Sequence, residues 1–205
     1  MSHVRFRIVK KRLISLGRAV AIAALVLWSP GTAQAAPITF TAALGPEAVG
    51  ATGSGFVTVV YDGTAKTLSI DATFLGLSGI TTVAHIHCCT AVPGTGTVGV
   101  AVTPGTLPGF PVGLSAGSYT TSPLLDLSST ATYTGSFLTA GGGTAAGAEA
   151  RLLAGMYAGT AYFNIHSSTF GGGEIRGFLQ EVPEPVSLLL FGTALTALAV
   201  RRRRI

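Results

Sequence analysis

Alternation of apolar and polar side chains around an Asp-Gly turn is the feature that most constrains how this chain can fold. Residues 55–61 form a run rich in Val, Phe and Tyr, and Asp62-Gly63 follows it. In residues 66–74 every second side chain then points to one face, and that apolar set is Leu68, Ile70, Ala72 and Phe74. A period of two on both sides of such a turn predicts an antiparallel hairpin with one buried face.

Further short strands are expected along the middle of the chain, between clusters of Gly, Pro, Ser and Thr; their ranges are 39–44, 82–88, 97–102, 124–127, 158–166 and 174–180. This number of short strands predicts an all-β fold, a single antiparallel sandwich or small barrel.

Two segments of the middle region depart from the strand pattern. Residues 144–155 are rich in helix formers, with Thr144 as a cap and Gly155 as a stop, so we expect one short helix there. Residues 94–117 are rich in Gly and Pro. We expect them to form a surface connection whose Phe110 packs on the core.

The basic residues gather at the two ends of the chain. Six of the thirteen precede the first apolar run and four close the chain, which leaves only Lys66, Arg151 and Arg176 between them. All eight acidic residues lie in that middle region, whose net charge is −5 although the whole chain carries +5. A nucleic-acid-binding surface on the folded part is therefore excluded. A hydrophobic content of 48% with 10% charged residues also argues against intrinsic disorder.

Residues 1–36 have the order of a secretory signal peptide. A basic stretch up to Arg18 precedes an apolar run over 19–28, a Ser-Pro-Gly breaker, and the small residues Ala35 and Ala36. The run of about ten residues is short for a bilayer that requires about 20. We therefore expect cleavage by signal peptidase after Ala35 or Ala36, with an uncleaved anchor as the alternative.

Residues 182–205 have the features of a second targeting segment, in addition to the signal peptide. The tripeptide Pro183-Glu184-Pro185 precedes an apolar stretch over 186–200, and four arginines follow, Arg201, Arg202, Arg203 and Arg204. Fifteen residues at about 1.5 Å each reach about 22 Å, slightly short of a full membrane span. Arginines directly after the span favour a cytoplasmic carboxy terminus. A plain tail anchor is one interpretation of this segment.

The tripeptide, the apolar helix and the arginine cluster together resemble the PEP-CTERM sorting signal of exopolysaccharide-producing Gram-negative bacteria. The resemblance implies recognition by an exosortase, a membrane-embedded transpeptidase-like enzyme, after an inner-membrane intermediate. The chain is then expected at the cell surface or in the extracellular matrix, where polysaccharide or other matrix proteins are its expected partners.

Three histidines remain in the predicted mature domain, residues 37–181. In residues 83–88 the strand period places His85 and His87 on one face, about 7 Å apart. The third, His166, ends a strand that belongs to a different hairpin. Two imidazoles on one strand face can converge on a single ion, so we predict that the three histidines approach one another.

Residues 161–166 and 174–179 predict the second hairpin. If His166 pairs with Glu174, directly opposed residues separate into two faces. The apolar face is Ala161, Phe163, Ile165, Ile175 and Leu179, and the polar face is Asn164, His166, Glu174 and Arg176. This register places a carboxylate and a guanidinium beside His166, either as an ion pair between themselves or as part of a site.

Several of these segments resemble the CHRD domain, first described as a repeat in chordin. The resemblance covers roughly residues 38–180, and it depends on the segments Ala84-His85-Ile86-His87, Gly99 to Val102, Ala148 to Gly155, Asn164 to Ser167 and Gly172 to Gly177. It implies an immunoglobulin-like β-barrel with a faint similarity to copper/zinc superoxide dismutases, and no settled biochemical function. Cys88-Cys89-Thr90 departs from the Gly-Pro that many members carry after the second histidine.

The two cysteines, Cys88 and Cys89, are adjacent in a chain expected to be exported, where oxidation is favoured. They can form an eight-membered ring with each other, bridge to another chain, or remain thiols and bind metal. The sequence leaves these three fates open.

The function that the sequence favours is that of an exported, non-enzymatic binding or structural protein. The alternative is a surface or periplasmic protein that binds copper or zinc through His85, His87 and His166, with Glu174, Cys88 or Cys89 in the outer set. A dismutase-like bimetal site needs more histidines than these three, and no Gly-x-Ser-x-Gly elbow is present for a hydrolase. A hydrogen-bonded polar cluster that fixes the sheet register is the purely structural interpretation of the histidines.

Overall fold

The computed structural model describes residues 35–183. Residues 1–34 of the predicted signal peptide and Glu184 to Ile205 of the predicted sorting segment lie outside this range, so the structure leaves both predictions untested. Within the described range, no helix has the length and apolar character needed to cross a membrane.

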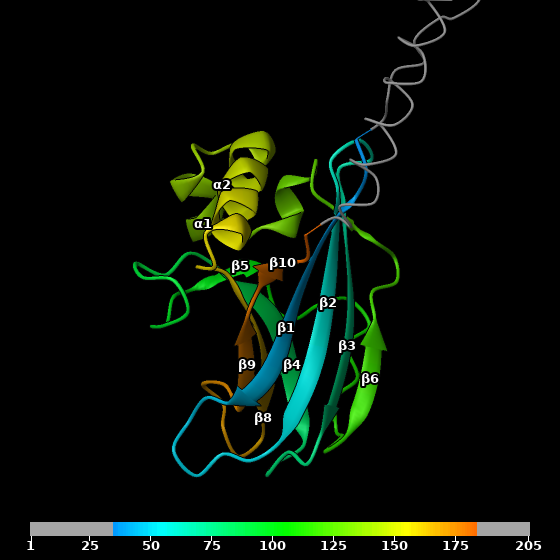
Figure 1. Cartoon of the computed structure of the whole chain (residues 1–205), viewed down its shortest axis with the longest axis vertical. Helices are drawn as coiled ribbons and strands as arrows, with labels where there is room; N and C mark the ends of the chain where they lie inside the picture. The colour runs from blue at the N-terminus through cyan, green and yellow to red at the C-terminus, as the bar shows by residue number, and fades with distance from the viewer. Residues whose placement is uncertain (1–34, 184–205) are drawn as a thin grey trace, which may run out of the picture. The chain divides into compact units, whose positions relative to one another are not determined.

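The domain is built on a curled antiparallel sheet (Figure 1). Its main path runs β5-β4-β8-β9-β1-β2-β3-β6, while β10 pairs with β1 and β7 with β3. The strands are β1 (Ile38–Pro46), β2 (Ser54–Asp62), β3 (Thr67–Leu75), β4 (Thr81–His87), β5 (Val100–Val102), β6 (Gly117–Thr120), β7 (Leu125–Asp126), β8 (Tyr162–Ser167), β9 (Ile175–Phe178) and β10 (Gln180–Glu181). The prediction of a mostly-β antiparallel fold is confirmed; the finer immunoglobulin-like or dismutase-like assignment stays a prediction.

Strand β1 joins the two halves of the sheet. Its residues 38–44 pair with β2, whereas Gly45 and Pro46 at its end pair with β9. The core lies on the inner face, and the side chains of both halves meet there as one buried apolar cluster. The halves therefore share one core although different hairpins build them.

The β2–β3 hairpin forms where the alternating pattern predicts it. Its register pairs Asp62 with Thr67, and the Asp62 carboxylate accepts hydrogen bonds from the backbone N–H groups of Thr64 and Ala65, both at 2.8 Å. This side-chain capping of the turn is the reason that Asp stabilises it. The predicted inward set of β3 is buried, at 3% exposure or less: Leu68, Ile70, Ala72 and Phe74.

Helix α2 (Ala145–Tyr157) begins as predicted and ends later than predicted. The Thr144 side chain caps it by accepting from the N–H of Gly147 at 3.1 Å. Gly155 does not stop the helix, because the left-handed conformation that ends it is adopted by Gly159, with φ of 65°. Glu149 on this helix accepts hydrogen bonds from Tyr61 at 2.6 Å and Lys66 at 2.9 Å and so ties the helix to the β2–β3 hairpin.

A second helix was not expected from the sequence. Helix α1 (Gly135–Ala140) packs against α2 at one end of the sheet, and a 3-10 turn, η1 (Thr130–Thr132), precedes it (Figure 1). The helix predicted over 144–155 is therefore confirmed, but the expectation of a single helix is wrong. Six residues that begin with Gly and Ser carry too little helix propensity to be recognised, and α1 is stabilised by tertiary contact with β5 and α2.

Several strands are shorter than predicted. Only Val100–Val102 of the range 97–102 and Leu125–Asp126 of 124–127 are strand, and the expected strand over 158–166 begins only at Tyr162, since α2 and its cap occupy the residues before it. Strand β6 was missed because it holds one buried apolar side chain, that of Tyr119.

The connection over residues 94–117 does more than cross the surface. As predicted, Phe110 packs on the core, with its ring centroid 5.4 Å from that of Tyr119 and 6.1 Å from that of Phe74. Parts of the same connection also cover the polar face of β4 and β8, where the carbonyls of Val98 and Gly105 reach the histidines. Strand β8 is consequently buried along its whole length.

Candidate metal centre

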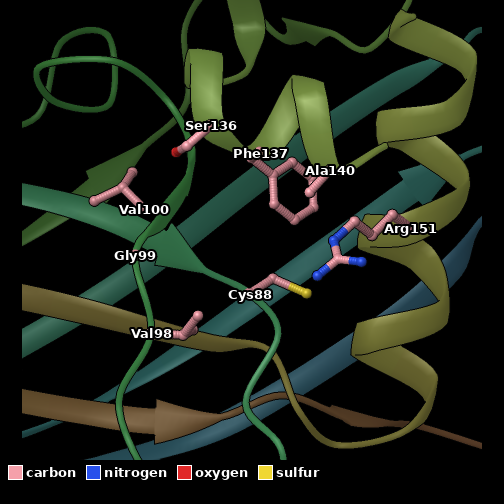
Figure 2. Close-up of a pocket in the computed structure, with 8 residues that line it drawn as sticks. All are labelled: Cys88, Val98, Gly99, Val100, Ser136, Phe137, Ala140 and Arg151. Atoms are coloured by element: carbon pink, nitrogen blue, oxygen red, sulfur yellow. The ribbon is translucent and has the colours of Figure 1, made fainter. Parts of the chain in front are cut away.

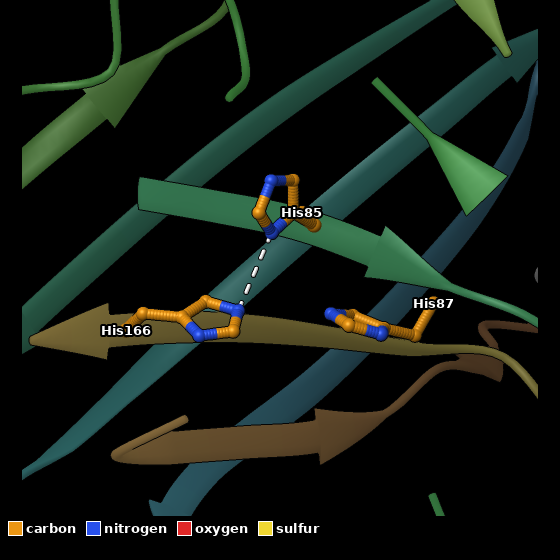
Figure 3. A group of neighbouring side chains, drawn as sticks. All are labelled: His85, His87 and His166. Carbon is orange, nitrogen blue, oxygen red and sulfur yellow. Dashed lines mark hydrogen bonds between the residues drawn. The ribbon is translucent and has the colours of Figure 1, made fainter. Parts of the chain in front are cut away.

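Strands β4 and β8 bring the three histidines of the described domain together (Figure 3). In the antiparallel register of the two strands, Val83 opposes His166 and His85 opposes Asn164, so His85, His87 and His166 share one face. One nitrogen from each ring lies within 4.8 Å of the others, and all three side chains are buried. The predicted convergence of the histidines is confirmed.

Each imidazole ring is held by a backbone carbonyl through one of its two nitrogens. The contacts are His85 Nε2 to Gly105 O at 2.8 Å, His87 Nδ1 to Val98 O at 2.8 Å, and His166 Nδ1 to Gly171 O at 2.9 Å. A carbonyl oxygen only accepts, so in each case the ring nitrogen must be the protonated one. The three carbonyls therefore determine the tautomer of every neutral ring.

In the neutral form of each ring the second nitrogen carries a lone pair. These second nitrogens, His85 Nδ1, His87 Nε2 and His166 Nε2, face one another. His85 Nδ1 lies 3.3 Å from His166 Nε2 (Figure 3), a contact that is a hydrogen bond only if one of those rings carries a second proton. His87 Nε2 is buried and has no hydrogen-bond partner among the described residues. With all three rings in their neutral form, the cluster thus presents three lone-pair acceptors to one another.

Electrostatics disfavour a proton in that position. Burial lowers the pKa of His85, with a further lowering from the neighbouring His166. Burial lowers the pKa of His87 to about 4, and the positive charges of His85, His166 and Arg176 act in the same direction. At neutral pH these two rings are therefore in the neutral form that binds metals.

Acidification is expected to destabilise the metal-free protein as the pH falls from about 6.5 towards 4. His87 has an ordinary pKa of 6.5 when unfolded and about 4 when folded, so the unfolded state binds more protons in this window. The stability contributed by the neutral ring is fully present above pH 6.5, and its loss should total about 2–3 kcal/mol. Urea unfolding from pH 7 to pH 4 measures it. A His87→Gln variant that shows the same decline would contradict the assignment to His87.

The cluster fits the requirements of a divalent transition-metal ion. Such an ion lies about 2.0–2.1 Å from each imidazole nitrogen, so a tetrahedral site holds its nitrogens about 3.4 Å apart. The 3.3 Å separation of His85 Nδ1 and His166 Nε2 matches that value, and a ring nitrogen of His87 lies within 4.8 Å of both. Carbonyls behind the ligating rings are the outer-sphere partners usual for metal-binding histidines. The buried triad could hold a metal.

Aromatic and charged side chains support the triad from β8 and β9. Tyr162 stacks on the His87 ring at 4.7 Å and 5°, and the Arg176 guanidinium lies 5.0 Å from the centre of the Tyr162 ring. Arg176 pairs with Glu47 at 3.0 Å, not with Glu174, so the alternative in which Glu174 and Arg176 form an ion pair is wrong. No sequence pattern indicates Glu47, because it lies directly after β1, far from the histidines along the chain.

Glu174 lies outside the cluster that could hold a metal. The predicted β8–β9 register is confirmed, but the Glu174 carboxylate turns to the Ser78–Gly79 loop, where it accepts from the N–H of Ser78 and, at 3.4 Å, from that of Gly79. Burial raises the pKa of Glu174, but hydrogen bonds from Ser167, Ser78 and Gly79 outweigh it, and the pKa is lowered overall. This carboxylate ties two loops together and is not a ligand.

Cys88 and Cys89 are bonded to each other, so neither thiol is available to the triad. The disulfide is one of the three fates that the sequence left open. Cys88 forms part of the wall of a pocket of about 260 Å³ between β5 and the two helices (Figure 2). The pocket is lined by Cys88, Val98, Gly99, Val100, Ser136, Phe137, Ala140 and Arg151.

Gly155 of α2 is packed directly against this disulfide. A Cβ atom at that position would overlap the sulfur atoms of both Cys88 and Cys89. We expect Gly155→Ala to destabilise the protein by about 1–3 kcal/mol, the cost of overpacking a core. Gly135→Ala, which has open space around its added Cβ, is the control and should be neutral or slightly stabilising. Chemical denaturation of both variants measures the difference, and equal effects would contradict the packing.

Comparison of the chain with models of known protein families finds a match. Residues 38–179 match the family model of the CHRD domain, a range that contains all three histidines and both cysteines. No curated protein and no solved structure matches the chain.

Proposed function

Because the chain belongs to the CHRD-domain family, we propose that it is an exported, non-enzymatic protein of the cell envelope or extracellular matrix whose binding function includes a copper or zinc ion. The ion is held by His85, His87 and His166. A CHRD domain suggests an extracellular structural or binding role, and the mostly-β architecture agrees with such a role.

One observation carries the metal assignment: each of the three imidazoles is held by a backbone carbonyl through one ring nitrogen, and the remaining nitrogens converge. A cluster built only to fix the sheet register would gain from hydrogen bonds between its members. In the neutral state these rings can form none, and His87 Nε2 stays unpaired. A buried acceptor without a partner costs about 1–3 kcal/mol, which a bound cation removes. Imidazole is a suitable ligand for both copper and zinc.

Titration of the metal-stripped protein tests the proposal. Zn²⁺ and Cu²⁺ should each bind with a stoichiometry of one ion per chain at neutral pH. Binding to the folded state alone should raise the free energy of unfolding, by about 4 kcal/mol at a free ion concentration 1,000 times the dissociation constant. No binding of either ion to the folded protein at neutral pH would overturn the metal assignment.

The proposed location follows from the two ends of the chain. The signal-peptide pattern over 1–36 supports export, and the PEP-CTERM-like pattern over 182–205 supports processing by an exosortase. Polysaccharide or other matrix proteins are the partners that we propose there. The acidic, glycine-rich composition of the middle region suits a matrix component.

Intact mass spectrometry of protein recovered from outside the cell checks this location. We expect a chain that lacks the residues up to Ala35 or Ala36 and ends near Pro185, because both apolar segments act as transient membrane signals. Full-length protein in the inner membrane would contradict the sorting proposal and support a simple anchor.

A further inference from the structure

Two buried side-chain polar atoms have no hydrogen-bond partner among the described residues, and both belong to the face that carries the triad. They are His87 Nε2 and Asn164 Oδ1. Buried polar atoms are paired in the great majority of cases, so an unpaired one requires an explanation. The metal ion of the proposed function pairs His87 Nε2 but does not by itself account for Asn164.

Asn164 lies on the sheet face that carries the three histidines. It directly opposes His85 in the β4–β8 register and precedes His166 by two residues on the same face of β8. Directly opposed residues in antiparallel strands have Cβ atoms about 4.5–5.5 Å apart. The side chain is 1% exposed, so bulk water does not satisfy its oxygen.

The orientation of the Asn164 amide is set by Glu47. Asn164 Nδ2 donates a hydrogen bond to a carboxylate oxygen of Glu47, and Arg176 holds the other oxygen of that carboxylate at 3.0 Å. The flipped amide would place its oxygen against the carboxylate, which has no proton to donate when ionised. Since the nitrogen faces Glu47, the oxygen points away from it and must find a donor elsewhere.

A metal ion with three imidazole ligands has a fourth position, and in such sites that position holds water or another exchangeable ligand. Building on the proposed metal site, we propose that Asn164 Oδ1 accepts a hydrogen bond from this fourth ligand. The donor is a water molecule or another small ligand whose ligating atom carries a proton. Both unpaired atoms are then satisfied together, His87 Nε2 by the ion and Asn164 Oδ1 by the ligand on it.

The arrangement makes Asn164 a determinant of which ligands the ion accepts. Water, hydroxide or an amine can bind the metal and still donate to Asn164. Azide binds metals as an anion and has no proton, so it leaves the carbonyl oxygen unpaired in a buried position. The site therefore selects for proton-bearing ligands and against anions that can only accept.

Azide titration of the Cu²⁺-loaded protein, followed by its charge-transfer absorption, tests the inference. We expect Asn164→Leu, which keeps the volume and removes the acceptor, to bind azide about tenfold more tightly than the unaltered protein, the value of one ordinary hydrogen bond. Gln180→Leu is the matched control, since it makes the same amide-to-leucine change on an exposed residue of β10, and should leave azide affinity unchanged.

A second measurement uses the unaltered protein and so does not depend on the folding of a variant. Electron–nuclear double resonance of the Cu²⁺ form should show strongly coupled protons that disappear in D₂O and on addition of azide. Their absence, or an azide affinity in Asn164→Leu that is equal or weaker, overturns the role of Asn164 while the three-histidine site stands. Failure of Cu²⁺ to bind at all overturns both.

Discussion

Replacing His87 by glutamine is expected to lower the affinity for copper or zinc by at least about a hundredfold. Changes to the hydrogen-bonding partners behind metal ligands already cost about 10–100-fold, and loss of a ligand costs more. His87 is the most informative of the three positions, because its Nε2 is buried and unpaired and its low pKa keeps the ring neutral. Competition with a chromophoric chelator measures the affinity of both proteins.

Glu174→Gln is the control for this experiment. The sequence allows Glu174 as an outer ligand, but the structure directs its carboxylate to the N–H groups of Ser78 and Gly79. The variant should retain the metal affinity of the unaltered protein within a few-fold, even where it unfolds at a lower denaturant concentration. A large loss of affinity in Glu174→Gln with little change in His87→Gln would contradict the ligand assignment.

Truncation of Ile165 to alanine is expected to destabilise the domain by about 2–5 kcal/mol. Ile165 is fully buried on β8, between Ala84 of β4 and Ile175 of β9, so its removal leaves a cavity on the core face of the sheet. Denaturant unfolding at neutral pH in the presence of a chelator separates this effect from metal binding.

Thr169→Ala is the comparison for Ile165→Ala. Thr169 lies in the exposed loop between β8 and β9, and substitutions at such positions usually change stability by less than about 0.5 kcal/mol. Similar losses in both variants would show that the apolar face of β8 does not carry the core.

The sequence predicted the parts of the fold in which strand periodicity acts alone. In the β8–β9 hairpin, parity opposes Ile165 to Ile175 and Asn164 to Arg176, and the structure has the same pairs. The same parity placed His85 and His87 on one face of β4. A period of two determines which side chains share a face, and that sufficed to predict that the histidines meet.

What the sequence could not predict are the contacts made by irregular backbone. The carbonyls of Val98, Gly105 and Gly171 hold the three rings, yet any residue type supplies a carbonyl, so no pattern marks these positions. Glu47 reaches Arg176 and Asn164 from a strand end more than 100 residues away. Helix α1 could not be predicted for a related reason, because tertiary contact and not local helix propensity stabilises it.

These carbonyls also bear on the choice between a metal site and a purely structural cluster. In the neutral state each ring has one N–H, and it donates that N–H to a backbone carbonyl. No ring N–H then remains to donate to another ring. A hydrogen bond between two of the rings would therefore need a second proton on one of them, and burial lowers the pKa of both His85 and His87. A bound ion meets the same need without that cost.

X-ray absorption spectroscopy of the protein, equilibrated with copper or zinc at neutral pH and then freed of excess ion, tests the three-histidine site most directly. The account predicts one bound ion per chain, three imidazole nitrogens at about 2.0–2.1 Å, one further light ligand and no sulfur. A protein that retains no ion after this treatment, or an ion bound through sulfur, would contradict it. The convergence of His85, His87 and His166 would then serve only to fix the register of β4 and β8.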